Sequence, residues 1–233
     1  MAQKKGDRTY EMDMCNGPLF SKLIVFAVPL MLSGILQLLF NAADIIVVGR
    51  FAGSESLAAV GSTSSLINLL VNLFNGLSIG ANQRLKDLEE TVHTSILLAG
   101  IGGVILIFVG FFLSDPMLEL MGTPDEVLVL ATLYMKIYFL GMPATLIYNF
   151  GSAILRAIGD TRRPLYFLLT AGVINVVLNL IFVIQFSMGV AGVALATTIS
   201  QCVSAALIIQ CLARSDAPYR LQKSKLKLKG DKV

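Results

Sequence analysis

Polar side chains recur at helical spacing inside otherwise apolar stretches of this 233-residue chain. Ser33, Gln37, Asn41 and Asp44 follow one another at intervals of four, four and three residues, which places them on one face of a helix. A carboxylate on such a face can hold a proton or pair with a cation, while neighbouring amides complete its shell. We interpret Asp44 as a candidate cation-binding group that faces a water-accessible interior; the alternative is a position at the outer membrane interface.

Similar polar residues occur on three further apolar stretches. They are Asn68 and Asn72 in the second stretch, Asn175 and Asn179 in the fifth, and Thr197 and Gln201 in the sixth. Each pair is separated by about one helical turn, so each pair shares a face. These residues either line a common cavity or form hydrogen bonds between helices without a part in transport.

Two prolines interrupt apolar stretches. Pro29 lies in the first and Pro143 in the fourth, and each removes a backbone hydrogen bond and favours a bend. We predict hinges at both positions, although a bend can also be plain architecture. Lys136, in the fourth stretch, is expected to snorkel to the interface or to pair with an acid.

The elements that must position these residues are membrane helices. Hydrophobic residues make up 55% of the chain and charged residues only 14%, which excludes an ordinary soluble domain. A membrane helix needs about 20 mostly apolar residues, and six segments qualify. They span approximately 23–48, 57–80, 94–113, 127–148, 165–186 and 190–212. Turn signals separate them, among them Asp115-Pro116, and no segment alternates with a period of two residues. The predicted fold is all-α and polytopic.

The basic residues predict the orientation of the bundle. Sixteen of the 18 Lys and Arg residues fall before the first stretch, between the second and third, between the fourth and fifth, or after the sixth. Because cytoplasmic connections carry an excess of Lys and Arg, both termini are predicted to be cytoplasmic. The chain is thus divided into a cytoplasmic segment 1–22, a six-helix membrane lobe 23–212 and a basic cytoplasmic tail 213–233. We predict a multi-pass protein of the plasma membrane.

The sequence offers little for catalysis. There are three cysteines, without metal-ligand spacing, and a single histidine, so no metal site is predicted. No phosphate loop, nucleophile elbow or HExxH motif occurs. We therefore predict no catalytic residue, no cofactor and no enzymatic activity.

Several strings resemble those of one transporter family. They are Pro29-Leu30-Met31, Leu39-Phe40-Asn41-Ala42-Ala43-Asp44, Leu57-Ala58-Ala59-Val60-Gly61, Gly76-Leu77-Ser78-Ile79-Gly80-Ala81-Asn82, the run Ala153–Pro164, Asn175-Val176-Val177-Leu178-Asn179 and the run Gly189–Thr197. Together they resemble the multidrug and toxic compound extrusion (MATE) family, in its bacterial DinF-like branch. The resemblance covers the chain from Gly17 to about Gln222.

The resemblance implies an antiporter that expels organic cations or other amphipathic compounds in exchange for protons or sodium. It implies two six-helix lobes around a central cavity, of which this chain would supply the amino-terminal one. Asp44, Asn175, Asn179 and Thr197 would form the cation-coupling site, lined further by Gln37, Asn41, Asn68, Asn72 and Gln201. Many relatives have a second acid where Asn179 stands, so a mechanism with two acids is not expected here.

The resemblance also sets the partners and the alternatives. Family members are roughly twice as long, and they continue further after the position of Asn82, where the join to Gln83-Arg84 is abrupt. We expect a second six-helix lobe or a homodimer, membrane lipid and a small cationic or amphipathic substrate, and no nucleic acid. The alternatives are a lobe of a lipid-linked oligosaccharide flippase, which would favour a more cationic cavity, and a non-transporting remnant or scaffold.

Overall fold

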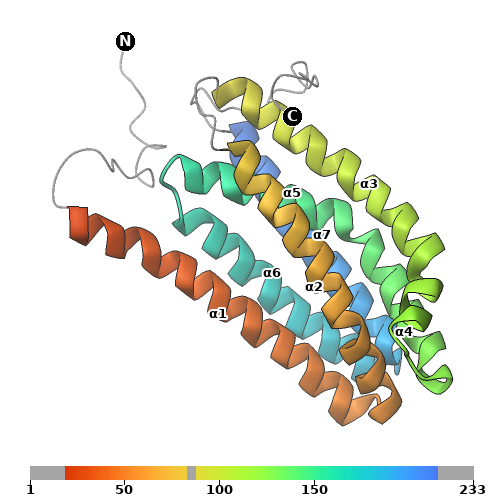
Figure 1. Cartoon of the computed structure of the whole chain (residues 1–233). Coiled ribbons are helices and arrows are strands. Elements are labelled where there is room, and N and C mark those ends of the chain that lie inside the picture. Colours follow the sequence, from red (N-terminus) through yellow and green to blue (C-terminus); the bar gives the residue numbers. More distant parts are fainter. Residues whose placement is uncertain (1–18, 83–87, 215–233) are drawn as a thin grey trace.

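The computed structural model describes residues 19–82 and 88–214, and within them the chain is helical, without strands (Figure 1). In chain order the elements are α1 (Leu19–Phe51), α2 (Ser54–Asn82), α3 (Leu88–Leu120), α4 (Asp125–Leu140), α5 (Met142–Ala157), α6 (Arg162–Leu180), the π-helix η2 (Ile181–Gln185) and α7 (Gly189–Arg214). The predicted all-α fold is confirmed. The segments 1–18 and 215–233 and the join after Asn82, on which we also made predictions, lie outside the described residues.

The described helices can account for six membrane spans. Five of them are long and apolar enough to cross a membrane, and α4 and α5 together provide a sixth that is bent by 49°. The first, second, third and sixth apolar stretches lie within α1, α2, α3 and α7, and the fourth lies within the bent pair. The fifth runs through α6 and the π-helix that continues it. The helices mostly extend beyond the predicted stretches because their ends need not be apolar.

The prolines act differently in the two interrupted spans. Pro143 lies in the first turn of α5, directly after the break at Gly141, where its missing N–H costs no helical hydrogen bond. Pro29 lies inside α1, which runs on as one helix, and the Ser33 hydroxyl donates a 2.8 Å hydrogen bond to the Pro29 carbonyl. The bend therefore occurs at the second proline; whether either residue is a hinge stays a prediction.

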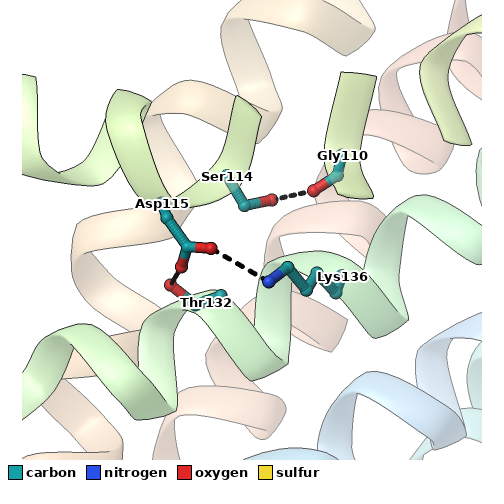
Figure 2. Close-up of polar contacts among 5 residues, drawn as sticks. All are labelled: Gly110, Ser114, Asp115, Thr132 and Lys136. Carbon is teal, nitrogen blue, oxygen red and sulfur yellow. Dashed lines mark hydrogen bonds and ion pairs between the residues drawn. The ribbon is translucent and has the colours of Figure 1, made fainter. Parts of the chain in front are cut away.

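The turn predicted at Asp115-Pro116 is wrong, because α3 continues through both residues to Leu120. Asp115 accepts a 2.5 Å hydrogen bond from the Thr132 hydroxyl and one of 3.0 Å from the Lys136 ammonium, both on α4 (Figure 2). These contacts tie the end of α3 to α4, and a single proline removes only one backbone hydrogen bond from the helix. Lys136 thus pairs with an acid, which is one of the two outcomes that the sequence predicted for it.

Close packing at two glycines holds α3 against both halves of the bent span. Gly103 lies against Pro143 on α5, and Gly110 lies against Phe139 on α4, so closely that a Cβ at either glycine would overlap its neighbour. Phe139 is fully buried, and next to this contact the Ser114 hydroxyl donates to the Gly110 carbonyl (Figure 2). Because α3 contacts both α4 and α5, on the two sides of the break between them, these contacts stabilise the bent arrangement. On the other side of the bundle, α1 packs along α6 and α6 along α7 (Figure 1).

The turn between α5 and α6 is built by local hydrogen bonds. Gly159 adopts a positive φ of 89° and, with Asp160, closes the end of α5 through hydrogen bonds to the Arg156 and Leu155 carbonyls. The Asp160 carboxylate then accepts the backbone N–H groups of the first two residues of α6, each at 3.1 Å. The same carboxylate pairs with the Arg163 guanidinium at 3.1 Å. Asp160 therefore helps to close α5 through its backbone N–H and caps the start of α6 with its buried carboxylate.

Candidate functional site

A cavity of about 190 Å³ lies between α1, α2, the bent pair α4–α5, α6 and α7. Its lining contains Asp44, Asn175 and Thr197 from the predicted coupling site, and all five residues predicted to line a cavity: Gln37, Asn41, Asn68, Asn72 and Gln201. Asn179 is not among the lining residues, since it lies behind Asp44 and is completely buried. The structure thus brings together residues that are as much as 164 positions apart in sequence, from Gln37 to Gln201.

Asp44 is held by a short chain of polar side chains. It is 8% exposed, and its carboxylate accepts a hydrogen bond from the Asn179 amide. The same amide nitrogen donates to the Asn175 side-chain oxygen at 3.2 Å, and the Asn175 nitrogen donates to the Thr197 hydroxyl at 3.2 Å. Helices α1, α6 and α7 are therefore linked through one carboxylate, two amides and one hydroxyl, which are the four residues predicted as the coupling site.

The Asn179 side chain leaves one oxygen without a partner. Its nitrogen serves both Asp44 and Asn175, while its buried Oδ1 has no hydrogen-bond partner among the described residues. A buried acceptor left in this way costs free energy unless a donor or a cation reaches it. The site therefore has an unused oxygen on the amide that holds the carboxylate.

The position of Asp44 is set by helix packing one turn earlier. Phe40 on α1 lies against Gly172 on α6, so closely that a Cβ at Gly172 would overlap the ring. Because Phe40 and Asp44 are four residues apart, they share one face of α1, and the ring contact brings the carboxylate to α6. Phe40 and Gly172 also line the cavity.

Sequence reasoning missed the polar residues that the bent span contributes. Tyr138, Thr145, Tyr148 and Asn149 all line the cavity, and so do Ser200 and Ser204 on α7. A signal was present: Tyr138, Thr145 and Asn149 are separated by seven and four residues, which is the spacing of one helical face. Tyr138 and Tyr148 are amphipathic and fit an apolar stretch, so they conceal the polar face of this span.

Charge is scarce in the cavity. Asp44 is the only carboxylate among the described residues that line it, and no Lys, Arg or His lines it. The pair of Asp115 and Lys136 is not part of this lining, and its side chains are 51% and 30% exposed. No group of three or more His, Cys, Asp or Glu residues that could hold a metal occurs in the described ranges. The chemistry available at this site is hydrogen bonding around one acid.

Comparison with known proteins decides the family. The sequence profile of the MatE family matches residues 29–181, which is most of the membrane part of the chain. The chain belongs to the MatE family. A probable multidrug resistance protein of Bacillus subtilis (strain 168), YpnP, is 34% identical over 200 residues, covering 81% of this chain and 44% of that protein. The multidrug export protein MepA of Staphylococcus aureus (strain bovine RF122 / ET3-1) is 29% identical over 212 residues, covering 86% and 47%.

A solved structure agrees with the sequence comparison. The crystal structure of MATE in the bent conformation superimposes with a TM-score of 0.85 at 26% sequence identity, covering 99% of this chain and 52% of that chain. The predicted resemblance to MATE transporters is therefore confirmed, and the chain is a multi-pass membrane protein of a transporter family rather than an enzyme. This MatE chain spans about half the length of the relatives it matches.

Proposed function

We propose that this chain is the amino-terminal lobe of a cation-coupled efflux antiporter, with Asp44 as the coupling carboxylate. The observation that carries the proposal is the position of Asp44. It is the sole carboxylate in the cavity lining among the described residues, and Asn179, Asn175 and Thr197 link it across three helices. The names of YpnP and MepA, which refer to multidrug resistance and export, support efflux as the direction.

The proposed coupling follows from competition for one charge. A buried carboxylate with few polar neighbours binds one positive charge strongly, either an inorganic cation or a cationic substrate. When a proton or a sodium ion occupies Asp44, a positively charged substrate loses its counter-charge and is released. Exchange then requires that the cavity open alternately to the two sides of the membrane, which transporters of two bundles achieve by rocking about a central site.

Partners and orientation belong to the same proposal. We propose that a second six-helix bundle, a second copy or a separate lobe, covers the cavity in the working transporter, because Gln37, Asn41, Asn68 and Asn72 are exposed in this chain. If both termini are cytoplasmic, as predicted, the C-terminal end of α3 and the N-terminal end of α4 would lie on the outer side of the membrane. The cavity lining in the described residues has no basic side chain, which does not favour the flippase alternative, whose substrates carry phosphates.

The test is a binding competition on the purified chain in lipid nanodiscs. Ethidium, a permanent organic cation, is titrated at several sodium and proton concentrations. We expect ethidium affinity to fall as one of these ions is raised, because ion and substrate are negatively linked through Asp44. In Asp44→Asn, ethidium should bind about tenfold more weakly or worse, and its affinity should no longer depend on the ion.

A matched control is Gln185→Leu, which removes an exposed amide that does not line the cavity. It should keep both the affinity and the ion dependence of the native chain. An Asp44→Asn variant that still responds to the ion as the native chain does would place the coupling site elsewhere. A native chain whose ethidium binding responds to neither ion would remove the basis of the antiport proposal.

A further inference from the structure

Arg156, in the last turn of α5, carries a charge that has no counter-charge in the described part of the chain. Its side chain is partly buried, and its Nε atom is enclosed without a hydrogen-bond partner among the described residues. The guanidinium forms no ion pair with a described acid either. A guanidinium has five N–H donors in a rigid plane, and a buried donor without an acceptor costs free energy. This position therefore calls for an acceptor, and an anion suits it best.

A second polar group without a partner lies one turn earlier on the same face of α5. Ser152 is 1% exposed, and its hydroxyl oxygen has no hydrogen-bond partner in the ranges that the structure describes. Residues four apart are neighbours on a helix surface, so the Ser152 hydroxyl and the Arg156 guanidinium lie together. They do not bond to each other, and an acceptor between them can bond to both.

The neighbouring arginines show how a charge is satisfied in this part of the chain. The Arg163 guanidinium pairs with Asp160 at 3.1 Å and contacts the Cys211 sulfur at 3.5 Å. Asp160 is the only acid between Arg156 and Arg163, and its carboxylate also accepts two backbone N–H groups. Arg162 is exposed. Three arginines thus flank one acid, and that acid is already occupied by Arg163 rather than by Arg156.

The two side chains lie where the chain leaves the membrane. The bent span ends at Ala157, and the next span begins at Arg162. At the same end of the bundle α1 and α3 begin and α2 and α7 end (Figure 1). Lipid headgroups surround the last turn of a spanning helix, so phosphate groups are abundant at this depth. With cytoplasmic termini, as predicted, this is the leaflet whose anionic lipids attract basic side chains.

We propose that Arg156 and Ser152 form a binding site for a phosphate group, which the headgroup of an anionic phospholipid supplies. The guanidinium fork matches two phosphate oxygens, and the Ser152 hydroxyl is a further donor one turn deeper in the membrane. Neither residue is among those that line the cavity around Asp44. The inference therefore concerns a separate site and does not depend on the proposed antiport.

The test is native mass spectrometry of the full chain in detergent micelles, which counts bound lipids one by one. Three lipids share dioleoyl chains: phosphatidylglycerol has an anionic phosphate, phosphatidylcholine has one neutralised by choline, and dioleoylglycerol has none. We expect the first phosphatidylglycerol to bind about tenfold more tightly than the first phosphatidylcholine, and dioleoylglycerol to bind most weakly. Millimolar inorganic phosphate should leave phosphatidylglycerol bound; displacement would overturn the headgroup as the source of the phosphate.

Variants locate the preference at the site. Arg156→Gln should lower the affinity for phosphatidylglycerol about tenfold, to that for phosphatidylcholine, because the guanidinium is lost. Arg156→Lys keeps the charge without the fork and should lose about threefold, as should Ser152→Ala, which removes one donor. The matched control is Arg162→Gln, which removes the same charge from an exposed arginine of the same turn. Its affinity should stay within a factor of about two of the native value.

Three outcomes overturn the inference. The first is a native chain that binds phosphatidylglycerol and phosphatidylcholine equally. The second is an equal loss in Arg156→Gln and Arg162→Gln, because a diffuse positive surface then explains the preference. The third is a preference that survives in Arg156→Gln, as expected if a carboxylate of a second bundle is the partner of this arginine. Circular dichroism checks that each variant is folded; if Arg156→Gln is not, full affinity in Ser152→Ala overturns the inference by itself.

Discussion

The packing of α3 against the bent span can be tested with two alanines in the same helix. At Gly110 a new Cβ would overlap the Cβ and ring of Phe139, which are fixed near the α4 backbone. At Gly100, ten residues earlier, a new Cβ meets nothing within 4 Å. Gly110→Ala and Gly100→Ala therefore make the same chemical change in the same helix and differ only in what surrounds the added methyl group.

The expected magnitude follows from this difference. Alanine is favoured over glycine in a helix by about 1 kcal/mol, and this gain applies to both variants. Overpacking a filled site costs about 1–3 kcal/mol, and this cost applies to Gly110→Ala alone because Phe139 Cβ cannot turn away as the end of a flexible side chain could. We expect Gly100→Ala to be neutral or slightly stabilising, and Gly110→Ala to be about 1–3 kcal/mol less stable than Gly100→Ala.

The assay is reversible unfolding in mixed detergent micelles, followed by circular dichroism, with both variants and the native chain in the same micelle. Because the propensity gain cancels between the variants, the difference between them reports the contact of α3 with α4. Equal stabilities would refute the close contact. A destabilised Gly100→Ala would instead show that the open space beside Gly100 is filled in the membrane.

Three further predictions concern local contacts and orientation. Asp160→Ala should lower the free energy of unfolding by at least about 1–2 kcal/mol in the same assay, because two N–H groups at the start of α6 lose their acceptor and the Arg163 guanidinium loses its carboxylate partner; Asp160→Asn keeps the acceptor but not the ion pair, so its free energy of unfolding should fall less than that of Asp160→Ala. Asp115→Asn should cost less than about 1 kcal/mol because the pair with Lys136 is partly exposed, and a double-mutant cycle with Lys136→Met should give a coupling of the same size. A cysteine at Glu119 should react with an impermeant maleimide from outside the cell; labelling only from the cytoplasm would reverse the proposed orientation.

The helices were predictable from the sequence because few backbone structures can span the hydrocarbon core of a membrane. A stretch of about 20 apolar residues has few alternatives to a spanning helix, so composition and turn residues sufficed for α1, α2 and α7. The error at Asp115-Pro116 has a specific cause. Both residue types disfavour a helix interior, and the Thr132 and Lys136 side chains that hold the end of α3 in place lie 17 and 21 residues further along the chain. The helix propensities of the residues around Asp115 carry no information about such a tertiary contact.

The site was predictable in part for a similar reason. A polar residue within an apolar helix is expensive, so its spacing reveals a face that must meet something polar. This reasoning located Gln37, Asn41, Asn68 and Asn72 on the lining of one cavity, but it could not show that Asn179 lies behind Asp44 rather than beside the open space. The tyrosines of the bent span were not predicted as lining residues because an amphipathic ring fits either lipid or water. Its presence alone does not indicate which face of the helix meets the cavity.

The distribution of exposed residues on α1 bears on the proposal that a second bundle covers the cavity. Ile35, Leu38 and Leu39 are exposed and apolar, as a surface in contact with lipid tails requires. Gln37 and Asn41 are exposed as well, yet they point into the cavity beside Asn68 and Asn72 of α2. Carboxamides cannot meet hydrocarbon without a substantial cost, so the open side of the cavity must border on water, substrate or protein. The proposed second bundle would meet this requirement, because it would keep lipid out and leave room for water and substrate between the bundles. We therefore propose that the exposed carboxamides in front of Asp44 form one side of a binding site whose other side lies on that bundle.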